Sequence, residues 1–98
     1  MEFFVLASLH AKQDRQTELR RQLISLVGPS RKDAGNLRYE LFADQNDDRR
    51  FVILEHWADP QAQQKHHTES EHIVHFEKEQ KAALVEKVEL FYSLDRIA

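Results

Sequence analysis

Apolar side chains recur along the chain in patterns that predict four strands. Residues Glu2–His10 are apolar on both alternating sets of positions, as expected for a strand that is covered on both faces. Residues Leu37–Ala43 alternate between apolar and polar side chains, and Phe51–Trp57 form another apolar run after the polar segment 44–50. These two runs and the turn between them favour an antiparallel hairpin. Residues Val88–Leu94 predict the last strand.

A first helix is predicted between the first strand and the hairpin. Leu and Val residues recur at helical spacing over residues 19–27, and Asp14 is the expected N-cap. The Gly28–Pro29 pair either ends this helix or kinks it, and in the second case the helix continues to about Asp33. Gly35 provides the stop signal, because glycine adopts the left-handed conformation that often follows a helix.

A second helical region follows the hairpin. Asp59–Pro60 is typical of a helix start, with Asp as N-cap and Pro in the first turn, and a short helix should run to about His67. Thr68–Glu71 resembles a capping box that would start a longer helix, with Ser70 as an alternative N-cap. The apolar positions of this longer helix are Ile73, Phe76, Ala83 and Leu84.

The resulting order, β-α-β-β-α-β, predicts the fold class. Four strands and two main helical regions in this order are typical of a ferredoxin-like α+β fold with an antiparallel sheet. Right-handed crossovers place both helical regions on one face of that sheet. A chain of 98 residues has room for one domain, which we assign to residues 1–98.

The sheet face that the helices leave uncovered is predicted to be an interface. In the third strand, Ile53 and Trp57 lie on one face, and Val52 and Leu54 lie on the other. An apolar face without cover marks an interaction surface, so we expect a two-fold homodimer with sheet packed towards sheet. A monomer with a flat, polar sheet face is the alternative. Because a chain of this size buries a limited core, we expect a ligand pocket to need the second chain.

Composition and charge exclude several functional classes. The chain carries 14 Lys and Arg against 17 Asp and Glu, and this net charge of −3 disfavours a nucleic-acid-binding protein. No run approaches the ~18 apolar residues that span a bilayer, and the first residues lack the basic start and cleavage site of a signal peptide. The absence of cysteine excludes disulfides, thiol catalysis and Cys-ligated zinc. We therefore expect a cytoplasmic protein that binds neither nucleic acid nor a membrane.

Several motifs together resemble one known family. Gly35–Leu41 resembles its G-x-L-x-Y-x-L second strand, and Phe51–Trp57 resembles its F-x-x-x-E-x-W third strand. His67 and His72 resemble its A-H-x-x-(S/T)-P-H-F helix junction, and Gly28–Arg31 resembles the Ala-Pro-Ser-Arg of its first helix. This ordered set covers essentially the whole chain and resembles the antibiotic biosynthesis monooxygenase (ABM) family of dimeric α+β barrels. The resemblance implies a single ABM-like domain, but not one reaction, because the family includes monooxygenases, haem-degrading enzymes and an isomerase.

The resemblance also implies a pocket near the end of the third strand. Trp57 would line this pocket and stack on an aromatic substrate, or it would instead anchor the corner between strand and helix. Glu55 shares the face of Trp57, and in an apolar cavity its carboxylate would have a raised pKa and act as a base or acceptor. The alternative for Glu55 is a structural ion pair with Arg38 across the hairpin. Further substrate-binding candidates are Tyr39, Phe51, Ile53 and Phe76.

Histidines supply the candidate catalytic groups. His67 and His72 match family positions at the pocket mouth, and imidazole exchanges protons near neutral pH. The alternative is that both side chains only hydrogen-bond the helix junction. His66 has no family counterpart and is expected to be solvated. His67, His72 and His75 could suggest a metal site, but there is no H-E-x-x-H pattern and no metal is expected.

Three functions stay open, of which the first is favoured. A cofactor-independent monooxygenase would deprotonate a small phenol or hydroquinone, whose anion then reacts with O₂ in a pocket between sheet and helices. An isomerase would shuttle protons on a small phosphorylated signalling metabolite, and would need a polar pocket with a basic anchor such as Arg38. A non-catalytic small-molecule-binding or stress-response protein is the third. His67 stands where the haem-degrading branch has Trp, and Ile53 where some phenol-oxidising members have Asn, so both specialised reactions are disfavoured.

Overall fold

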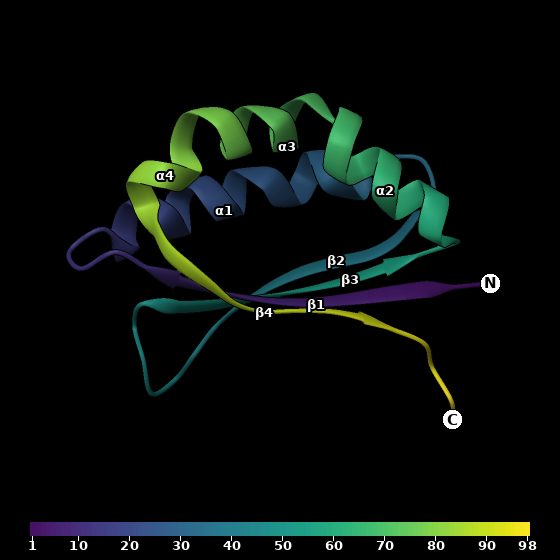
Figure 1. Ribbon diagram of the computed structural model, residues 1–98, viewed down its shortest axis with the longest axis horizontal. Coiled ribbons are helices and arrows are strands. Elements are labelled where there is room, and N and C mark those ends of the chain that lie inside the picture. Colours follow the sequence, from purple (N-terminus) through teal and green to yellow (C-terminus); the bar gives the residue numbers. More distant parts are fainter.

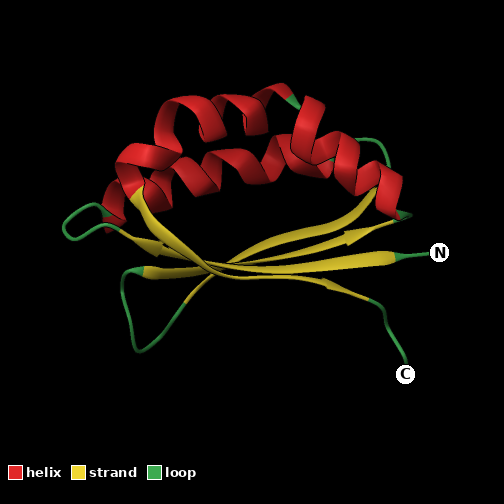
Figure 2. Ribbon diagram, viewed as in Figure 1, coloured by secondary structure: helices red, strands yellow, loops and turns green.

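The computed structural model describes residues 1–98 and confirms the predicted α+β fold (Figure 1). Its elements are β1 (Phe3–Ala11), α1 (Gln16–Arg31), β2 (Asn36–Ala43), β3 (Arg50–Trp57), α2 (Pro60–Glu69), α3 (Glu71–His75), the π-helical segment η1 (Phe76–Gln80), α4 (Lys81–Leu84) and β4 (Val85–Leu94). The strands form one antiparallel sheet in the order β2-β3-β1-β4, which is the ferredoxin-like arrangement. All helices cover the same face of the sheet, so the molecule has two layers (Figure 2).

The register of the sheet places Glu55 in the middle of the helix-covered face. Val5 of β1 and Tyr39 of β2 are its cross-strand partners on either side, and all three side chains are buried. The strand β1 was predicted to be covered on both faces, and this is confirmed for the helix-covered face, because Val5, Ala7 and Leu9 belong to the hydrophobic core. A carboxylate therefore points into the layer between sheet and helices, where apolar side chains surround it.

Helix α1 continues through the Gly28–Pro29 pair and ends at Arg31, which agrees with the longer of the two predicted alternatives. The prediction that Asp14 is the N-cap is wrong. The tight turn after β1, closed by a 3.0 Å hydrogen bond from Arg15 N to Lys12 O, holds Asp14 at a φ of 65°. Aspartate tolerates this left-handed conformation better than most residues do, and Arg15 takes the N-cap position without a side-chain bond.

Gly35 has the predicted left-handed conformation, with a φ of 84°, but it ends the α1–β2 connection and does not stop the helix, whose C-cap is Lys32. It also lets α2 approach closely, because a Cβ on Gly35 would lie 2.5 Å from the Cβ of Ala62. The backbone N of Asn36 donates to Asp33 O, which tightens the same turn. As a result, Asp33 lies against the helical region that carries His66.

The start of α2 was predicted correctly, but its end was not. The carboxylate of Asp59 accepts a 2.8 Å hydrogen bond from the backbone N of Ala62, as expected for an N-cap. Thr68 lies inside α2, where its hydroxyl donates to a backbone carbonyl, so the predicted capping box is wrong. Ser70 takes the N-cap position of α3, yet its hydroxyl donates to Asp33 and leaves the helix backbone uncapped.

The last helical stretch differs from the uniform helix that the apolar spacing predicted. The segment η1 is a π-helical turn between the short helices α3 and α4. A π turn adds a residue to the turn and so changes which side chains share a face. Phe76, Glu77 and Lys81 consequently all border the space above the sheet. None of the helices combines the length and apolar character that crossing a bilayer requires.

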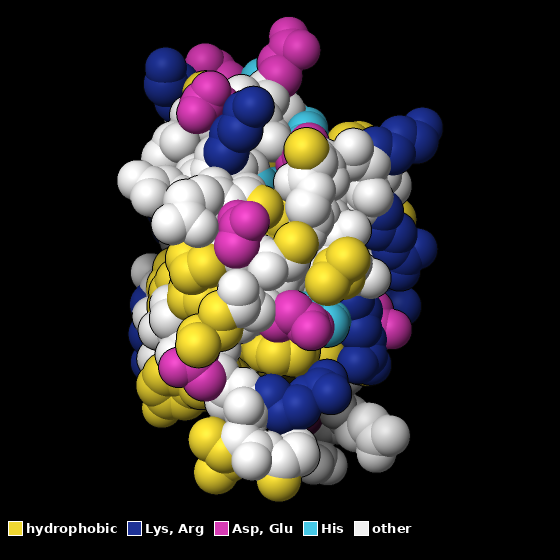
Figure 3. Space-filling view, turned by 90° about the vertical axis from the view of Figure 1, so that its right-hand side faces the viewer, with side chains coloured by type: hydrophobic (Ala, Val, Ile, Leu, Met, Phe, Trp, Pro, Cys, Tyr) yellow, Lys and Arg dark blue, Asp and Glu magenta, His cyan; other side chains and the backbone are white.

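The second face of the sheet has no helix over it. Four large apolar side chains on this face are between 39 and 49% exposed, namely Phe42, Leu90, Tyr92 and Leu94. Figure 3, which looks at the end of the molecule that carries both termini, shows hydrophobic side chains along one edge and Lys and Arg along the other. The expected homodimer stays a prediction, and this exposed face is the surface on which it depends.

Candidate active site

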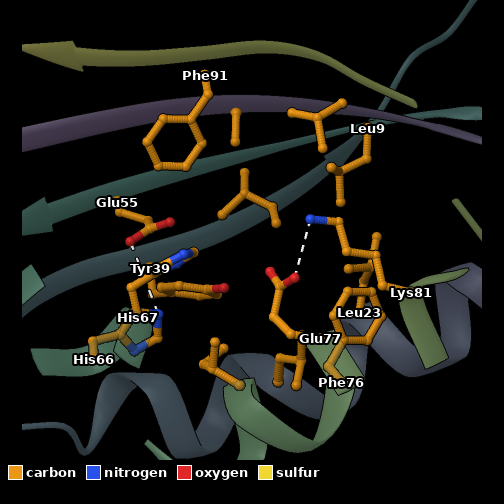
Figure 4. Close-up of a pocket in the computed structure, with 15 residues that line it drawn as sticks. Leu9, Leu23, Tyr39, Glu55, His66, His67, Phe76, Glu77, Lys81 and Phe91 are labelled. Carbon is orange, nitrogen blue, oxygen red and sulfur yellow. Dashed lines mark hydrogen bonds and ion pairs between the residues drawn. The ribbon is translucent and has the colours of Figure 1, made fainter. Parts of the chain in front are cut away.

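A cavity of about 110 Å³ lies between the sheet and the helices (Figure 4). All of its lining residues belong to one chain, and the expectation that a pocket needs the second chain stays a prediction. The small side chain of Ala7 on the sheet contributes to the space. Ten of its 15 lining residues are hydrophobic, and among them are Leu9, Leu23, Leu26, Ile53, Ile73 and Phe76. The other five lining residues are Glu55, His66, His67, Glu77 and Lys81, and Tyr39, which is counted with the ten, adds a phenol group.

Glu55 is the buried carboxylate of this cavity. Burial raises the pKa of Glu55 to about 7, although a hydrogen bond from Trp57 partly offsets that effect. The indole Nε1 of Trp57 donates this bond to Glu55 Oε1 at 2.9 Å. The alternative pairing with Arg38 is not formed, because Arg38 pairs with Glu40 on the exposed strand β2. The sequence predicted that an apolar cavity raises the pKa of Glu55, and the burial of this carboxylate agrees with that prediction.

Tyr39 lies beside Glu55 on the neighbouring strand. Burial is the main reason that the pKa of Tyr39 is raised above its ordinary value, and the nearby charge of Glu55 adds to the effect. The phenol is therefore protonated at neutral pH and can donate a hydrogen bond. Together, Tyr39 and Glu55 provide one donor and one acceptor side by side in a cavity whose lining is mostly hydrophobic.

His66 is buried, so the expectation that it is solvated is wrong. Its Nδ1 lies 2.7 Å from Asp33 Oδ2, and its Nε2 lies 4.0 Å from Glu55 Oε1. The ring packs between the rings of Trp57 and Tyr39, with centroid distances of 4.7 and 5.6 Å. Burial lowers the pKa of His66 despite the bond with Asp33. The imidazole is therefore neutral at pH 7.

Asp33 is the centre of a polar cluster behind His66. Its Oδ2 also accepts a 2.7 Å hydrogen bond from the hydroxyl of Ser70. Partial burial raises the pKa of Asp33, but the bonds from Ser70 and His66 outweigh this effect, and its pKa lies below the ordinary value. His72 Nε2 lies 3.6 Å from the same carboxylate oxygen and 3.1 Å from Ser30 Oγ. Asp33 is therefore a carboxylate that neighbouring donors stabilise.

The same cluster contains the residues best placed to hold a metal ion. Potential ligand atoms of Asp33, His66 and His72 lie within 4.8 Å of one another. Each of them already has a protein partner, because Asp33 Oδ2 accepts from two donors and His72 Nε2 bonds to Ser30. We therefore describe the cluster as a hydrogen-bond network. The three histidines that the sequence suggests as metal ligands, His67, His72 and His75, do not form a site, because His67 and His75 are not part of this cluster.

The two predicted catalytic histidines lie in different places. His67 is exposed and lines the mouth of the cavity, where its ring centroid lies 6.4 Å from that of Phe91. His72 does not line the cavity and instead belongs to the cluster around Asp33. A joint action of His67 and His72 on one substrate atom has no geometric basis here.

The predicted substrate-binding residues divide into two groups. Tyr39, Glu55, Ile53 and Phe76 line the cavity. Trp57 and Phe51 are buried in the core and are not lining residues. Trp57 acts on the cavity through its hydrogen bond to Glu55, which agrees better with the anchoring alternative than with stacking.

The sequence interpretation missed His66 and Asp33. The signal that could have found His66 is helical phase, because it follows the partly buried Ala62 by four residues and therefore shares its face. His67 is rotated by about 100° from that face, and so it lies at the cavity mouth. Asp33 has no comparable signal, since its position depends on the turn at Gly35.

Comparison with known proteins places the chain in a family. Residues 2–79 match the family described as "Antibiotic biosynthesis monooxygenase". The chain is 36% identical over 70 residues to a Bacillus subtilis (strain 168) protein named "Putative monooxygenase YcnE", which covers 71% of this chain and 73% of that protein.

Solved structures give the same result for the fold. The crystal structure of PA3566 from Pseudomonas aeruginosa is 33% identical, with a TM-score of 0.92 over 99% of this chain and 95% of that chain. Protein SO0527 from Shewanella oneidensis is 26% identical, with a TM-score of 0.90 over 97% of this chain and 90% of that chain. The match over residues 2–79 and the similarity to these proteins show that the chain belongs to the antibiotic biosynthesis monooxygenase (ABM) family.

Proposed function

We propose that this protein is a monooxygenase that oxidises a small, single-ring hydroquinone or phenol with O₂ and without a redox cofactor. Membership of the family supports the reaction class. The observation that carries the proposal is the carboxylate of Glu55, buried at the end of an apolar cavity with a pKa of about 7. A base of this pKa is suited to take a proton from a phenolic hydroxyl at neutral pH.

The size of the cavity supports a single aromatic ring as the substrate. An apolar cavity of roughly 150 Å³ is enough to admit benzene, whereas the cavity here measures about 110 Å³. A ring therefore requires a small movement of the side chains at the mouth, and the exposed His67 and half-exposed Phe91 are free to make it. A polycyclic substrate would require movement of the core.

The proposed chemistry begins with transfer of a phenolic proton to Glu55. The electron-rich anion then transfers one electron to O₂, and the two radicals combine to form a bond between oxygen and a ring carbon. Cleavage of the O–O bond leaves one oxygen on the ring and releases the other as water. Hydroquinone and O₂ thus give hydroxybenzoquinone and one water, and the substrate supplies all four electrons. The apolar walls keep bulk water from the reactive anion.

The alternative functions have less support from the cavity. A phosphorylated metabolite would need a free cationic group, but Lys81, the cation on the wall, is paired with Glu77 at 3.0 Å. Arg38, the anchor considered from the sequence, is not a lining residue. No observation favours the isomerase, and a non-catalytic binding protein is distinguished from an enzyme by the experiment below.

The experiment is O₂ consumption with a panel of substituted hydroquinones and phenols. The wild-type protein is compared with Glu55→Gln, in which an amide oxygen can still accept the Trp57 bond but cannot act as a base. We expect a loss of about 100-fold or more in kcat. Glu40→Gln is the matched control, because it makes the same change on the neighbouring strand β2 at a residue that does not line the cavity, and it should retain activity. Binding of hydroquinones without O₂ uptake above background would contradict the proposal and favour the binding protein.

A further inference from the structure

A pair of side chains behind Glu55 has the geometry of a proton relay. Asp33 Oδ2 lies 2.7 Å from Nδ1 of His66. Nε2, on the opposite side of the ring, lies 4.0 Å from Glu55 Oε1, and Figure 4 shows His66 and Glu55. Asp33 comes from the turn after α1, His66 from α2 and Glu55 from β3, so three separate elements align these groups. Triads of this kind orient a base through a third group.

We propose that His66 and Asp33 form a proton relay with Glu55, in which Asp33 is the positioning residue. This inference rests on the proposed monooxygenase function. Glu55 receives the substrate proton and passes it to Nε2 of His66. Asp33 holds the imidazole in place and stabilises its positive charge. When the O–O bond breaks, the relay returns the proton to the leaving oxygen, so that no net proton is released and water is formed.

The hydrogen-bond pattern determines which nitrogen faces the cavity with a lone pair. An ionised carboxylate has no proton to donate, so Asp33 can only accept a hydrogen bond. Nδ1 of His66 must therefore carry the proton between them. In the neutral ring, Nε2 is then an acceptor and is directed towards Glu55. The 4.0 Å gap is longer than a hydrogen bond, so transfer requires either a small approach of the two groups or a bridging hydroxyl.

Three further titratable residues lie around the ring of His66, and none of them is a carboxylate. Tyr39 contacts the ring from β2, and its phenol is protonated. His72 contacts it from α3, with a centroid distance of 5.9 Å, and lies on the side of Asp33. His67, the adjacent residue on α2, lies at the cavity mouth. Only Glu55 among these groups is a carboxylate on the cavity side.

The first test needs no substrate. Nitrogen-15 NMR of the imidazoles of the full-length protein identifies which ring nitrogen of His66 is protonated, with His66→Gln used to assign its signals. We expect the Nδ1–H form, although solvated histidines favour Nε2–H. An Nε2–H form of His66 would overturn the relay even if the protein oxidises hydroquinones. If His66 has the Nδ1–H form but the protein oxidises no hydroquinone, the proposed function is wrong. The relay, which rests on that function, is then wrong as well.

The second test separates a relay from a merely structural contact. Asp33→Asn keeps the shape but removes the charge, and we expect kcat to fall about 100-fold, with KM within about two-fold and the pKa of His66 lowered further. Glu69→Gln is the matched control, because it removes a carboxylate charge from an exposed position of α2 outside the cavity, and it should retain the wild-type kcat. The NMR signal of the Trp57 indole reports whether the Asp33→Asn protein is folded. A folded variant with unchanged kcat and unchanged His66 titration would overturn the proposal.

Discussion

The indole Nε1 of Trp57 donates a 2.9 Å hydrogen bond to Oε1 of Glu55, two residues earlier on the same face of β3. Trp57 is fully buried, so this bond is directed from the core towards the cavity. It stabilises the ionised form of a carboxylate that burial would otherwise keep protonated. The sequence suggested that Trp57 stacks on a substrate. In the structure, Trp57 instead affects the cavity by lowering the pKa of Glu55.

The first prediction concerns Trp57→Phe. Loss of the indole donor should raise the pKa of Glu55 above about 7, because a hydrogen bond to the charged form disappears. The pH at which hydroquinone oxidation reaches half of its maximum should therefore move upward by about one unit. The measurement is the pH dependence of kcat, with urea unfolding to confirm that the variant is folded. An unchanged profile in a folded variant would show that the bond has no effect on the base.

The second prediction concerns stability against pH. The pKa of Glu55 in the folded protein, about 7, lies above its ordinary value of 4.5. Between these pH values the folded protein holds a proton that the unfolded chain releases, so stability decreases as pH rises. Glu55→Gln removes this dependence. We expect the variant to gain about 3 kcal/mol relative to wild type between pH 4.5 and pH 8, measured by urea unfolding. Parallel curves for the two proteins would contradict a buried carboxylate with a raised pKa.

Much of the fold could be predicted from the sequence because its signals are local. Four features each depend on a few neighbouring residues, namely the apolar pattern of β1, the hairpin, the N-cap at Asp59 and the left-handed conformation of Gly35. Strand parity also placed Glu55 on the inner face, and the register then brought Tyr39 beside it. Successive side chains of a strand point to opposite faces of the sheet. The face of a residue can therefore be predicted even when the first residue of the strand is placed slightly wrongly.

The rest of the site depends on helical phase and on a close approach between distant segments. His66 and His67 differ by one position, yet one is buried and the other is exposed. The π turn of η1 changes the phase again, so apolar spacing identified the buried Ile73, Phe76 and Leu84 but not Glu77 and Lys81, which also line the cavity. Asp33 reaches His66 because Gly35 contacts Ala62, and no local pattern reports such a contact.

The third prediction uses the two glycines as a matched pair. Gly35→Ala should destabilise the fold, because Gly35 has a φ of 84° and an added Cβ would lie 2.5 Å from that of Ala62. We expect a loss of about 1–3 kcal/mol in the free energy of unfolding, with displacement of Asp33. Gly28→Ala meets no atom within 4 Å and lies inside α1, so it should stabilise by about 0.5–1 kcal/mol. Equal effects of the two substitutions would contradict this account.

The fourth prediction is the homodimer. Leu90 and Tyr92 are 39 and 49% exposed on the sheet face without helices, and burying such side chains is the expected reason for two copies to associate. The wild-type protein should therefore sediment at micromolar concentration with about twice the 11.6 kDa mass of one chain. Replacing both residues by Asp should yield a monomer, because each copy would place charges opposite the apolar face of the other. Gln64→Asp is the control, since Gln64 is exposed on α2, which covers the opposite face of the sheet (Figure 2). A well-folded wild-type monomer at these concentrations would show that the exposed apolar face does not form this interface.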